Sequence, residues 1–180
     1  GIQSGWDIKR ILGTVPVEED GSALFTIPAN TPISIQPLDK DGAAIQWMRS
    51  WLTGMPGEIV SCVGCHEEQN SIPIPKRTIA SAKQARRLET PEGGVRPFTF
   101  RLEVQPVLDR NCVSCHNGKN AEPDFRKDQM VTYKRGILTK INKQYDQSYL
   151  NLHPYVYRQG PESDIYVLKP AEFHASNSEL

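Results

Sequence analysis

The pattern Cys-x-x-Cys-His occurs twice in this chain of 180 residues, as Cys62–His66 and Cys112–His116. Together the two copies use all four cysteines and two of the four histidines. The pattern is the signature of c-type haem attachment. Its two thiols form thioether bonds to the haem, and the adjacent histidine binds the iron through a ring nitrogen. We therefore predict two covalently attached haem c groups, with tethers and proximal iron ligands at Cys62, Cys65 and His66, and at Cys112, Cys115 and His116.

Paired cysteines have two other uses, which remain open. Two Cys-x-x-Cys pairs can supply the four thiolates of a structural zinc site, and a single pair can act as a thioredoxin-like redox couple. Neither chemistry needs a histidine directly after the second cysteine. We therefore favour haem over a structural zinc-binding module and over a disulfide.

The composition indicates a small, loop-rich core. Apolar residues make up 38% of the chain, which also holds 14 prolines and 13 glycines. Two buried porphyrins would add the missing apolar contact area, so we expect the protein without haem to be poorly folded. The predicted fold class is mixed and mostly irregular with β-structure. A small N-terminal antiparallel β-sandwich or sheet precedes cytochrome c-like haem segments with short helices.

Apolar residues alternate with polar ones over residues 22–27 and 33–38, which predicts β-strands. Two turns ending in Asp-Gly, at residues 18–21 and 39–42, separate these stretches. Ahead of the first motif lies an apolar cluster for which we favour ordinary core packing. It could also pack on a porphyrin face, and either methionine is a candidate iron ligand. Its members are Trp47, Met48, Trp51, Leu52 and Met55.

Helices are expected later in the chain. Val104, Val107 and Leu108 repeat at helical spacing up to Cys112, with Pro106 acceptable close to the helix start. Shorter helices are predicted over residues 81–88 and 130–137. We place a domain boundary so that residues 1–95 form a β-structured domain carrying the first haem and residues 96–180 a cytochrome c-like domain carrying the second.

Charge is unevenly distributed along the chain, although its formal sum is zero. Net charges are −5 over residues 1–75, +8 over residues 76–143 and −3 over residues 144–180. The basic segment is either a solvated face that also pairs with haem propionates or a docking surface for an acidic redox partner. Aromatic residues do not interleave with it, which argues against nucleic-acid binding. The basic cluster includes Lys76, Arg77, Lys83, Arg86, Arg87, Arg126, Lys127, Lys134 and Arg135.

No apolar run is long enough to span a bilayer. Covalent haem attachment takes place outside the cytoplasm, so we expect a periplasmic or otherwise extracytoplasmic protein. The chain starts at Gly1 without a leader, which predicts a processed protein or a piece of a longer one.

Three stretches, residues 11–50, 56–67 and 104–116, resemble the dihaem region of the hydrazine synthase alpha subunit and its relatives. The resemblance implies a neighbouring β-propeller and a multihaem redox protein. In that family a Tyr four residues after the first motif histidine binds the catalytic haem iron, while the histidine helps to bind zinc. Asn70 stands at that position here, and an amide is a poor iron ligand. The resemblance therefore implies that His66 binds the first iron and leaves the specialised chemistry open.

The resemblance also implies a distal histidine shortly after a segment like Ser178–Leu180, where this chain ends. Within the chain, His153 and His174 bring the histidines to four, the number that two bis-His haems require. Bis-His ligation suits electron transfer and excludes substrate from the iron. We therefore predict a dihaem cytochrome c that passes single electrons between a redox partner and a neighbouring subunit or domain. A haem enzyme resembling hydrazine synthase, with the first haem catalytic and the second as electron feed, is the alternative.

Overall fold

The structure is a computed structural model that describes residues 9–46, 48, 51–63, 74, 76–127, 129–133, 143–157 and 169–180. The chain forms two compact units. The first unit comprises Gly1–Arg96 and Arg158–Asn177, and the second comprises Pro97–Tyr157 and Ser178–Leu180. The assignment of one haem to each predicted domain stays a prediction.

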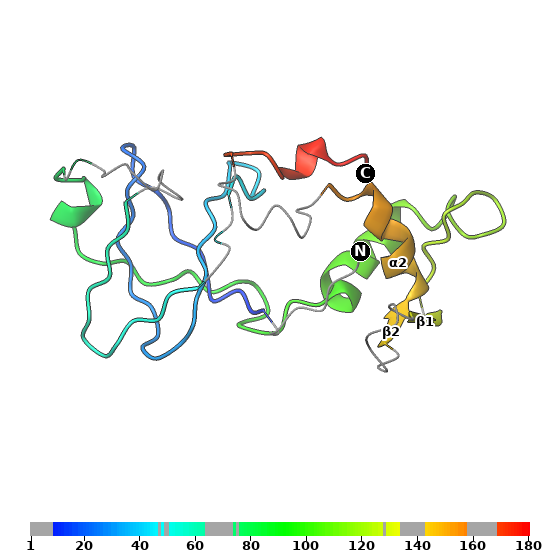
Figure 1. Cartoon of the computed structure of the whole chain (residues 1–180), viewed down its shortest axis with the longest axis horizontal. Helices are drawn as coiled ribbons and strands as arrows, with labels where there is room; N and C mark the ends of the chain where they lie inside the picture. Colours follow the sequence, from blue (N-terminus) through cyan, green and yellow to red (C-terminus); the bar gives the residue numbers. More distant parts are fainter. Residues whose placement is uncertain are drawn as a thin grey trace, which may run out of the picture. The chain divides into compact units, whose positions relative to one another are not determined.

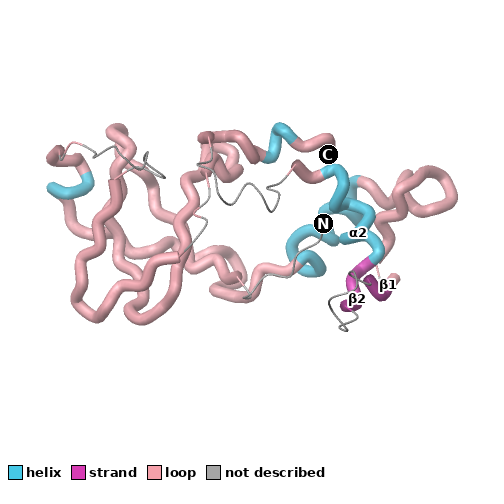
Figure 2. Tube along the Cα trace, in the orientation of Figure 1, coloured by secondary structure: helices cyan, strands magenta, loops and turns pink. Residues whose placement is uncertain are grey.

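The first unit consists mainly of loops, as Figure 2 shows. Within its described residues the β-pairing is limited to four isolated bridges, Thr14–Glu89, Phe25–Arg86, Ile33–Leu52 and Leu38–Ala44. The predicted N-terminal sandwich is therefore not present as regular strands in residues 9–46. Prolines explain the difference, because each one removes a backbone donor that a ladder needs. They stand at Pro16, Pro28, Pro32 and Pro37.

The two predicted turns of the first unit are confirmed. Gly21 N donates to Glu18 O at 2.9 Å, and Gly42 N donates to Asp39 O at 3.1 Å. Both glycines have φ near +80°, which only glycine adopts at no steric cost. The helix predicted over residues 81–88 is wrong. The chain forms a single 3₁₀ turn there, η1 (Ala80–Ala82). Lys83 is already extended there.

The described α-helices and β-strands lie in the second unit (Figure 1). A π-helical turn, η2 (Phe100–Val104), leads into α1 (Gln105–Asn111). This arrangement confirms the predicted helix ahead of the second motif. Pro106 lies in the first turn of α1, where its missing N–H is harmless.

Strands β1 (Met130–Tyr133) and β2 (Lys143–Asp146) form an antiparallel pair in which Met130 lies opposite Asp146. The helix predicted over residues 130–137 is thus wrong over residues 130–133, since the β-branched residues Val131 and Thr132 favour a strand, and its remainder lies outside the described residues. The chain continues from β2 into α2 (Gln147–Leu152) and then η3 (His153–Tyr155). A last 3₁₀ turn, η5 (Ala175–Asn177), belongs to the first unit.

The apolar core of the second unit is built from Leu108, Phe125 and Leu152. Phe100, Val104, Cys112 and Val113 pack against it. In the described part of the first unit, Ile33 and Ala80 are the buried hydrophobic residues. The mixed and mostly irregular fold class is confirmed. None of the helices within the described ranges has the length and apolarity to cross a membrane.

Candidate functional site

The second motif continues the last turn of α1. Cys112 caps the helix, and its N–H donates to Leu108 O at 2.9 Å. His116 N then donates to Cys112 O at 2.8 Å, so the motif forms one further turn. Cys112 is half-buried and Cys115 is exposed, and both are free thiols. The helix thus holds two thiols and one imidazole within five residues.

The imidazole of His116 packs on a core aromatic ring. Its ring centroid lies 5.4 Å from that of Phe125, and the planes are tilted by 47°. The backbones are joined as well, because Phe125 N donates to His116 O at 3.0 Å. His116 Nδ1 is buried and has no hydrogen-bond partner. Among the described side chains it is the one buried nitrogen or oxygen atom in this state. Nε2 is therefore the ring nitrogen that a ligand can reach.

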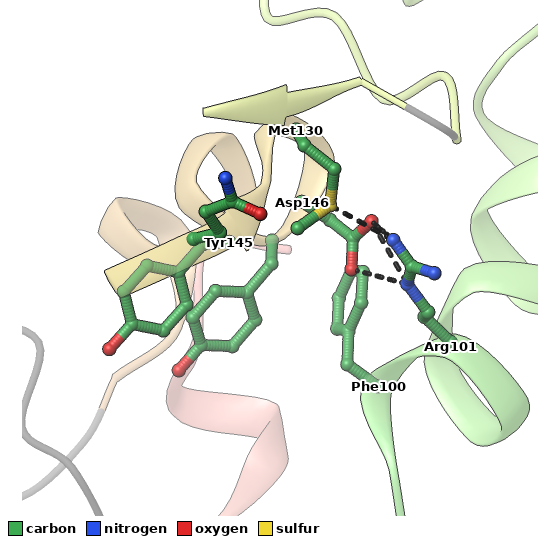
Figure 3. A pocket seen from close by; sticks show the side chains of 7 residues that line it. Phe100, Arg101, Met130, Tyr145 and Asp146 are labelled. Atoms are coloured by element: carbon green, nitrogen blue, oxygen red, sulfur yellow. Dashed lines mark hydrogen bonds and ion pairs between the residues drawn. The ribbon is translucent and has the colours of Figure 1, made fainter. Parts of the chain in front are cut away.

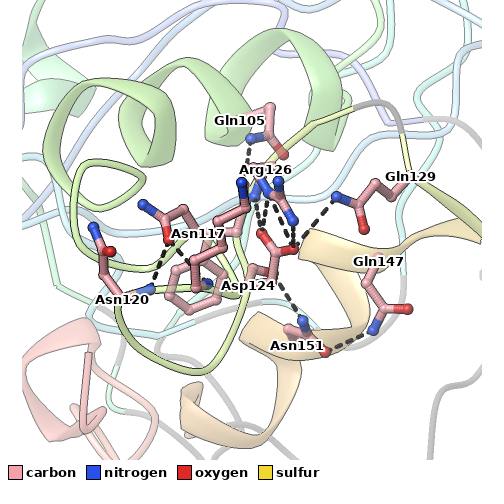
Figure 4. Close-up of polar contacts among 10 residues, drawn as sticks. Gln105, Asn117, Asn120, Asp124, Arg126, Gln129, Gln147 and Asn151 are labelled. Carbon is pink, nitrogen blue, oxygen red and sulfur yellow. Dashed lines mark hydrogen bonds and ion pairs between the residues drawn. The ribbon is translucent and has the colours of Figure 1, made fainter.

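The loop after the motif is held by short-range polar contacts (Figure 4). Asn117 Oδ1 accepts from the backbone N–H groups of Lys119 and Asn120 at 3.0 and 2.9 Å. Arg126 pairs with Asp124 at 2.6 Å, and its guanidinium lowers the pKa of that carboxyl to about 2. Gly118 has φ +70°, and a Cβ there would lie 2.9 Å from Asp124 Oδ2. Only glycine fits this position without strain.

Two helical side chains fix the end of this loop. Gln105 Nε2 donates to Phe125 O at 2.9 Å, and Gln105 Oε1 accepts from Ser148 Oγ at 2.6 Å. Asn151 Nδ2 donates to Asp124 O at 2.8 Å. Gln105 and Ser148 are buried, and such groups need partners in a low-dielectric interior. The network joins α1, α2 and the loop that carries Phe125.

His153, the histidine predicted as a distal ligand, lies in the same unit as the second motif. It begins η3, one residue after Leu152 of the core, and is half-buried. Its ring meets Tyr149 edge-on at 5.7 Å, and Tyr149 stacks on Tyr145 at 5.7 Å. Both tyrosines line an open pocket where Arg101 pairs with Asp146 at 2.7 Å (Figure 3).

The first motif is described only in part. Cys62 is an exposed free thiol, whereas Cys65, His66 and Asn70 lie outside the described residues. Large apolar side chains close to Cys62 in sequence are exposed, with Trp51 67% and Ile59 88% exposed. The others are Met55, Val60 and Val63. Met48, the second candidate methionine ligand, is half-buried, and Trp47 lies outside the described residues.

His174, the other predicted distal ligand, lies in the first unit and has both ring nitrogens occupied. Nε2 is 2.9 Å from Asp39 Oδ2, and Nδ1 is 2.7 Å from Ser176 Oγ. The hydrogen bond from His174 lowers the pKa of Asp39 below its usual range, with further help from the N–H of Ala43. An iron atom at either nitrogen would have to displace one of these partners.

Some residues of the predicted basic cluster form ion pairs with acidic side chains of the same chain. Glu18 lies 2.6 Å from Lys83 and 3.2 Å from Arg86, and both cations lower the pKa of its carboxyl. Arg126 is paired with Asp124 in the same way. Lys134 and Arg135 lie outside the described residues. The net positive charge of this cluster is thus smaller than the count of its basic residues indicates.

No group of three or more His, Cys, Asp or Glu side chains that could hold a metal ion is found in the part of the chain that the structure describes. The donor set at the second motif is therefore two thiols and one open imidazole nitrogen. Sequence reasoning missed Phe125, Gln105 and the Asp39 partner of His174. No local pattern marks them, because each acts on a residue at least nine positions away.

A comparison with known families confirms the resemblance. Residues 2–67 match the family model of the hydrazine synthase alpha subunit middle domain. The matched segment is a little over a third of the chain and contains the whole first motif. No curated protein and no solved structure matches the chain.

Proposed function

We propose that this chain is a dihaem c-type cytochrome that passes single electrons between a redox partner and a neighbouring subunit or domain. The observation that carries the proposal is the second motif. Two free thiols and an imidazole follow α1 in one turn, and the imidazole presents Nε2 while Nδ1 is covered. This donor set fits a covalently tethered porphyrin with a histidine-bound iron.

The residues have defined roles at this site. Cys112 and Cys115 would hold the haem c by thioether bonds, and His116 Nε2 would bind its iron. When bound, the group supplies a one-electron change at the iron. Phe125, which packs against the His116 ring, and Leu108 would exclude water there, since both are nearly fully buried. Hydrogen bonds from Gln105 to the carbonyl of Phe125 and from Asn151 to the carbonyl of Asp124 keep Phe125 in place.

For the first haem we propose Cys62 and Cys65 as tethers and His66 as proximal ligand. The exposed apolar side chains close to Cys62 in sequence support this proposal, because a bound group would cover apolar surface of this kind. His153 and His174 stay the candidate distal ligands. His153 is the better of the two, because His174 would have to give up Asp39 or Ser176.

The resemblance to the hydrazine synthase alpha subunit supports a partner subunit or domain, such as a β-propeller, as the source or acceptor of electrons. Covalent haem attachment supports a periplasmic or otherwise extracytoplasmic location. A haem enzyme resembling hydrazine synthase is the second candidate function. The match over residues 2–67 favours it, because the matched segment includes the first motif.

Spectroscopy of the holoprotein tests the proposal. The full chain, produced in a host that attaches haem c, should show a c-type α-band and carry haem on peptides containing Cys62–Cys65 and Cys112–Cys115. An entirely low-spin ferric EPR spectrum supports electron transfer. A high-spin component that binds cyanide or nitric oxide supports the enzyme instead. A colourless protein that contains only zinc would overturn both haem functions.

A further inference from the structure

The buried nitrogen of the His116 imidazole is Nδ1. A neutral imidazole that binds a metal through Nε2 carries its proton on Nδ1. In most metal-binding histidines that proton is donated to a carboxylate, a backbone carbonyl or water. Nδ1 of His116 is buried and has no carboxylate or carbonyl acceptor among the described residues. The apolar ring of Phe125 packs against the imidazole, with the ring centroids 5.4 Å apart.

The position of Phe125 is fixed by the protein. Its N–H donates to His116 O, and its carbonyl accepts from Gln105 Nε2. Gln105 is itself held by Ser148 Oγ at 2.6 Å and by Asp109 Oδ1 at 2.8 Å. The preceding carbonyl, on Asp124, accepts from Asn151. Phe125 is therefore held against the imidazole.

An acceptor on Nδ1–H makes an imidazole more basic and a stronger donor to its metal. A stronger donor stabilises ferric iron over ferrous iron. An imidazole that lacks the acceptor is a weaker donor and makes the iron easier to reduce. Hydrogen bonding to the axial ligand is one of the few means by which a protein sets a haem potential.

We propose that Phe125 is a positioning residue that keeps His116 Nδ1 without an acceptor and thereby raises the reduction potential of the second haem. The inference rests on the proposed function, since it assumes a haem bound by His116. In a titration, one electron from dithionite reduces ferric to ferrous iron, while the proton stays on Nδ1.

Two substitutions at one position separate hydrogen bonding from packing. Phe125→Gln places a carbonyl oxygen beside the imidazole, and Phe125→Leu keeps an apolar side chain there. Phe125→Gln should lower the equilibrium constant for reduction of the second haem by roughly tenfold, which equals 59 mV for a one-electron couple. Phe125→Leu should shift it much less. Equal shifts in the two variants, or no shift with Gln, would overturn the inference.

A second measurement needs no substitution. In the reduced holoprotein with ¹⁵N-labelled histidine, the Nδ1–H signal of His116 should have the shift of an unbonded proton and exchange slowly with solvent. A hydrogen-bonded shift would overturn the inference even if neither variant folds. Mass spectrometry of the same sample shows whether haem sits on Cys112 and Cys115. Its absence overturns the proposed function as well, whereas haem with a hydrogen-bonded Nδ1–H overturns this inference alone.

Discussion

The two units of the chain differ in what stabilises them. The second unit has helices, a strand pair and a core of Leu108, Phe125 and Leu152 with a buried polar network around it. The described part of the first unit has turns and isolated bridges, and its apolar side chains near Cys62 face solvent. The second unit thus has an apolar core made of its own side chains. In the first unit we expect the proposed haem to supply much of the apolar contact area.

Removing one haem tether at a time should have the largest effect and tests this comparison directly. Cys62→Ser should lose the first haem and strip the first unit of its hydrogen-exchange protection, since little buried apolar surface remains there. Cys112→Ser is the matched control. It should lose the second haem, yet α1 and α2 should stay protected because their core is made of protein. Equal loss of protection in both units would contradict the comparison.

The apolar core of the second unit can be tested on one helix. Leu108 is 3% exposed, so Leu108→Ala should lower the free energy of unfolding of this unit by about 3 kcal/mol. Its neighbour Val107 is 52% exposed. Val107→Ala should change the free energy by less than about 0.5 kcal/mol. Denaturant titration of the holoprotein measures both, and similar values for the two would refute the assigned core.

The buried polar network should contribute less than the core. Ser148 is fully buried, and its hydroxyl is a partner of Gln105 Oε1. Ser148→Ala leaves that oxygen without this donor and should cost about 1 to 3 kcal/mol. The exposed Ser34 of the first unit serves as control, and Ser34→Ala should have almost no effect. A neutral Ser148→Ala would mean that the network does not stabilise the second unit.

Acid should loosen the loop after the second motif. Arg126 lowers the pKa of Asp124 from 3.8 to about 2 in the folded protein. A lowered folded-state pKa adds stability that is present above the unfolded value and is lost as the pH falls through the folded value. The hydrogen-exchange protection factors of residues 117–126, which are corrected for the intrinsic exchange rate at each pH, should therefore fall between pH 4 and about pH 2. Asp124→Asn should remove this pH dependence, and an unchanged profile in that variant would exclude the ion pair as its cause.

The smallest effect concerns partner docking. Arg86 is paired with Glu18, whereas no ion pair of Arg87 occurs among the described residues. Arg87→Glu should slow reduction by an acidic redox protein by about twofold to threefold at low salt, and added salt should abolish the difference. Arg86→Glu is the matched comparison, which also shows whether the Glu18 pairing matters. Stopped-flow rates without any salt dependence would count against docking on this face.

Local patterns predicted some elements well. The helix before Cys112 follows from apolar spacing and a proline in the first turn, and both Asp-Gly turns follow from glycine conformation. The N-terminal strands were predicted from alternation alone. That pattern does not show which segment a strand pairs with, and here the partners, such as Glu89 and Arg86, are distant in sequence. Four prolines then limit each pairing to a single bridge.

The sequence by itself determined which donor groups each motif offers. Two thiols and a histidine within five consecutive residues stay close together in any fold. Only the tertiary structure decided which ring nitrogen of His116 stays open and which partners His174 has. Phe125 is nine residues from His116, and Asp39 is 135 residues from His174. Such pairings depend on the packing of the whole chain, which no local spacing encodes.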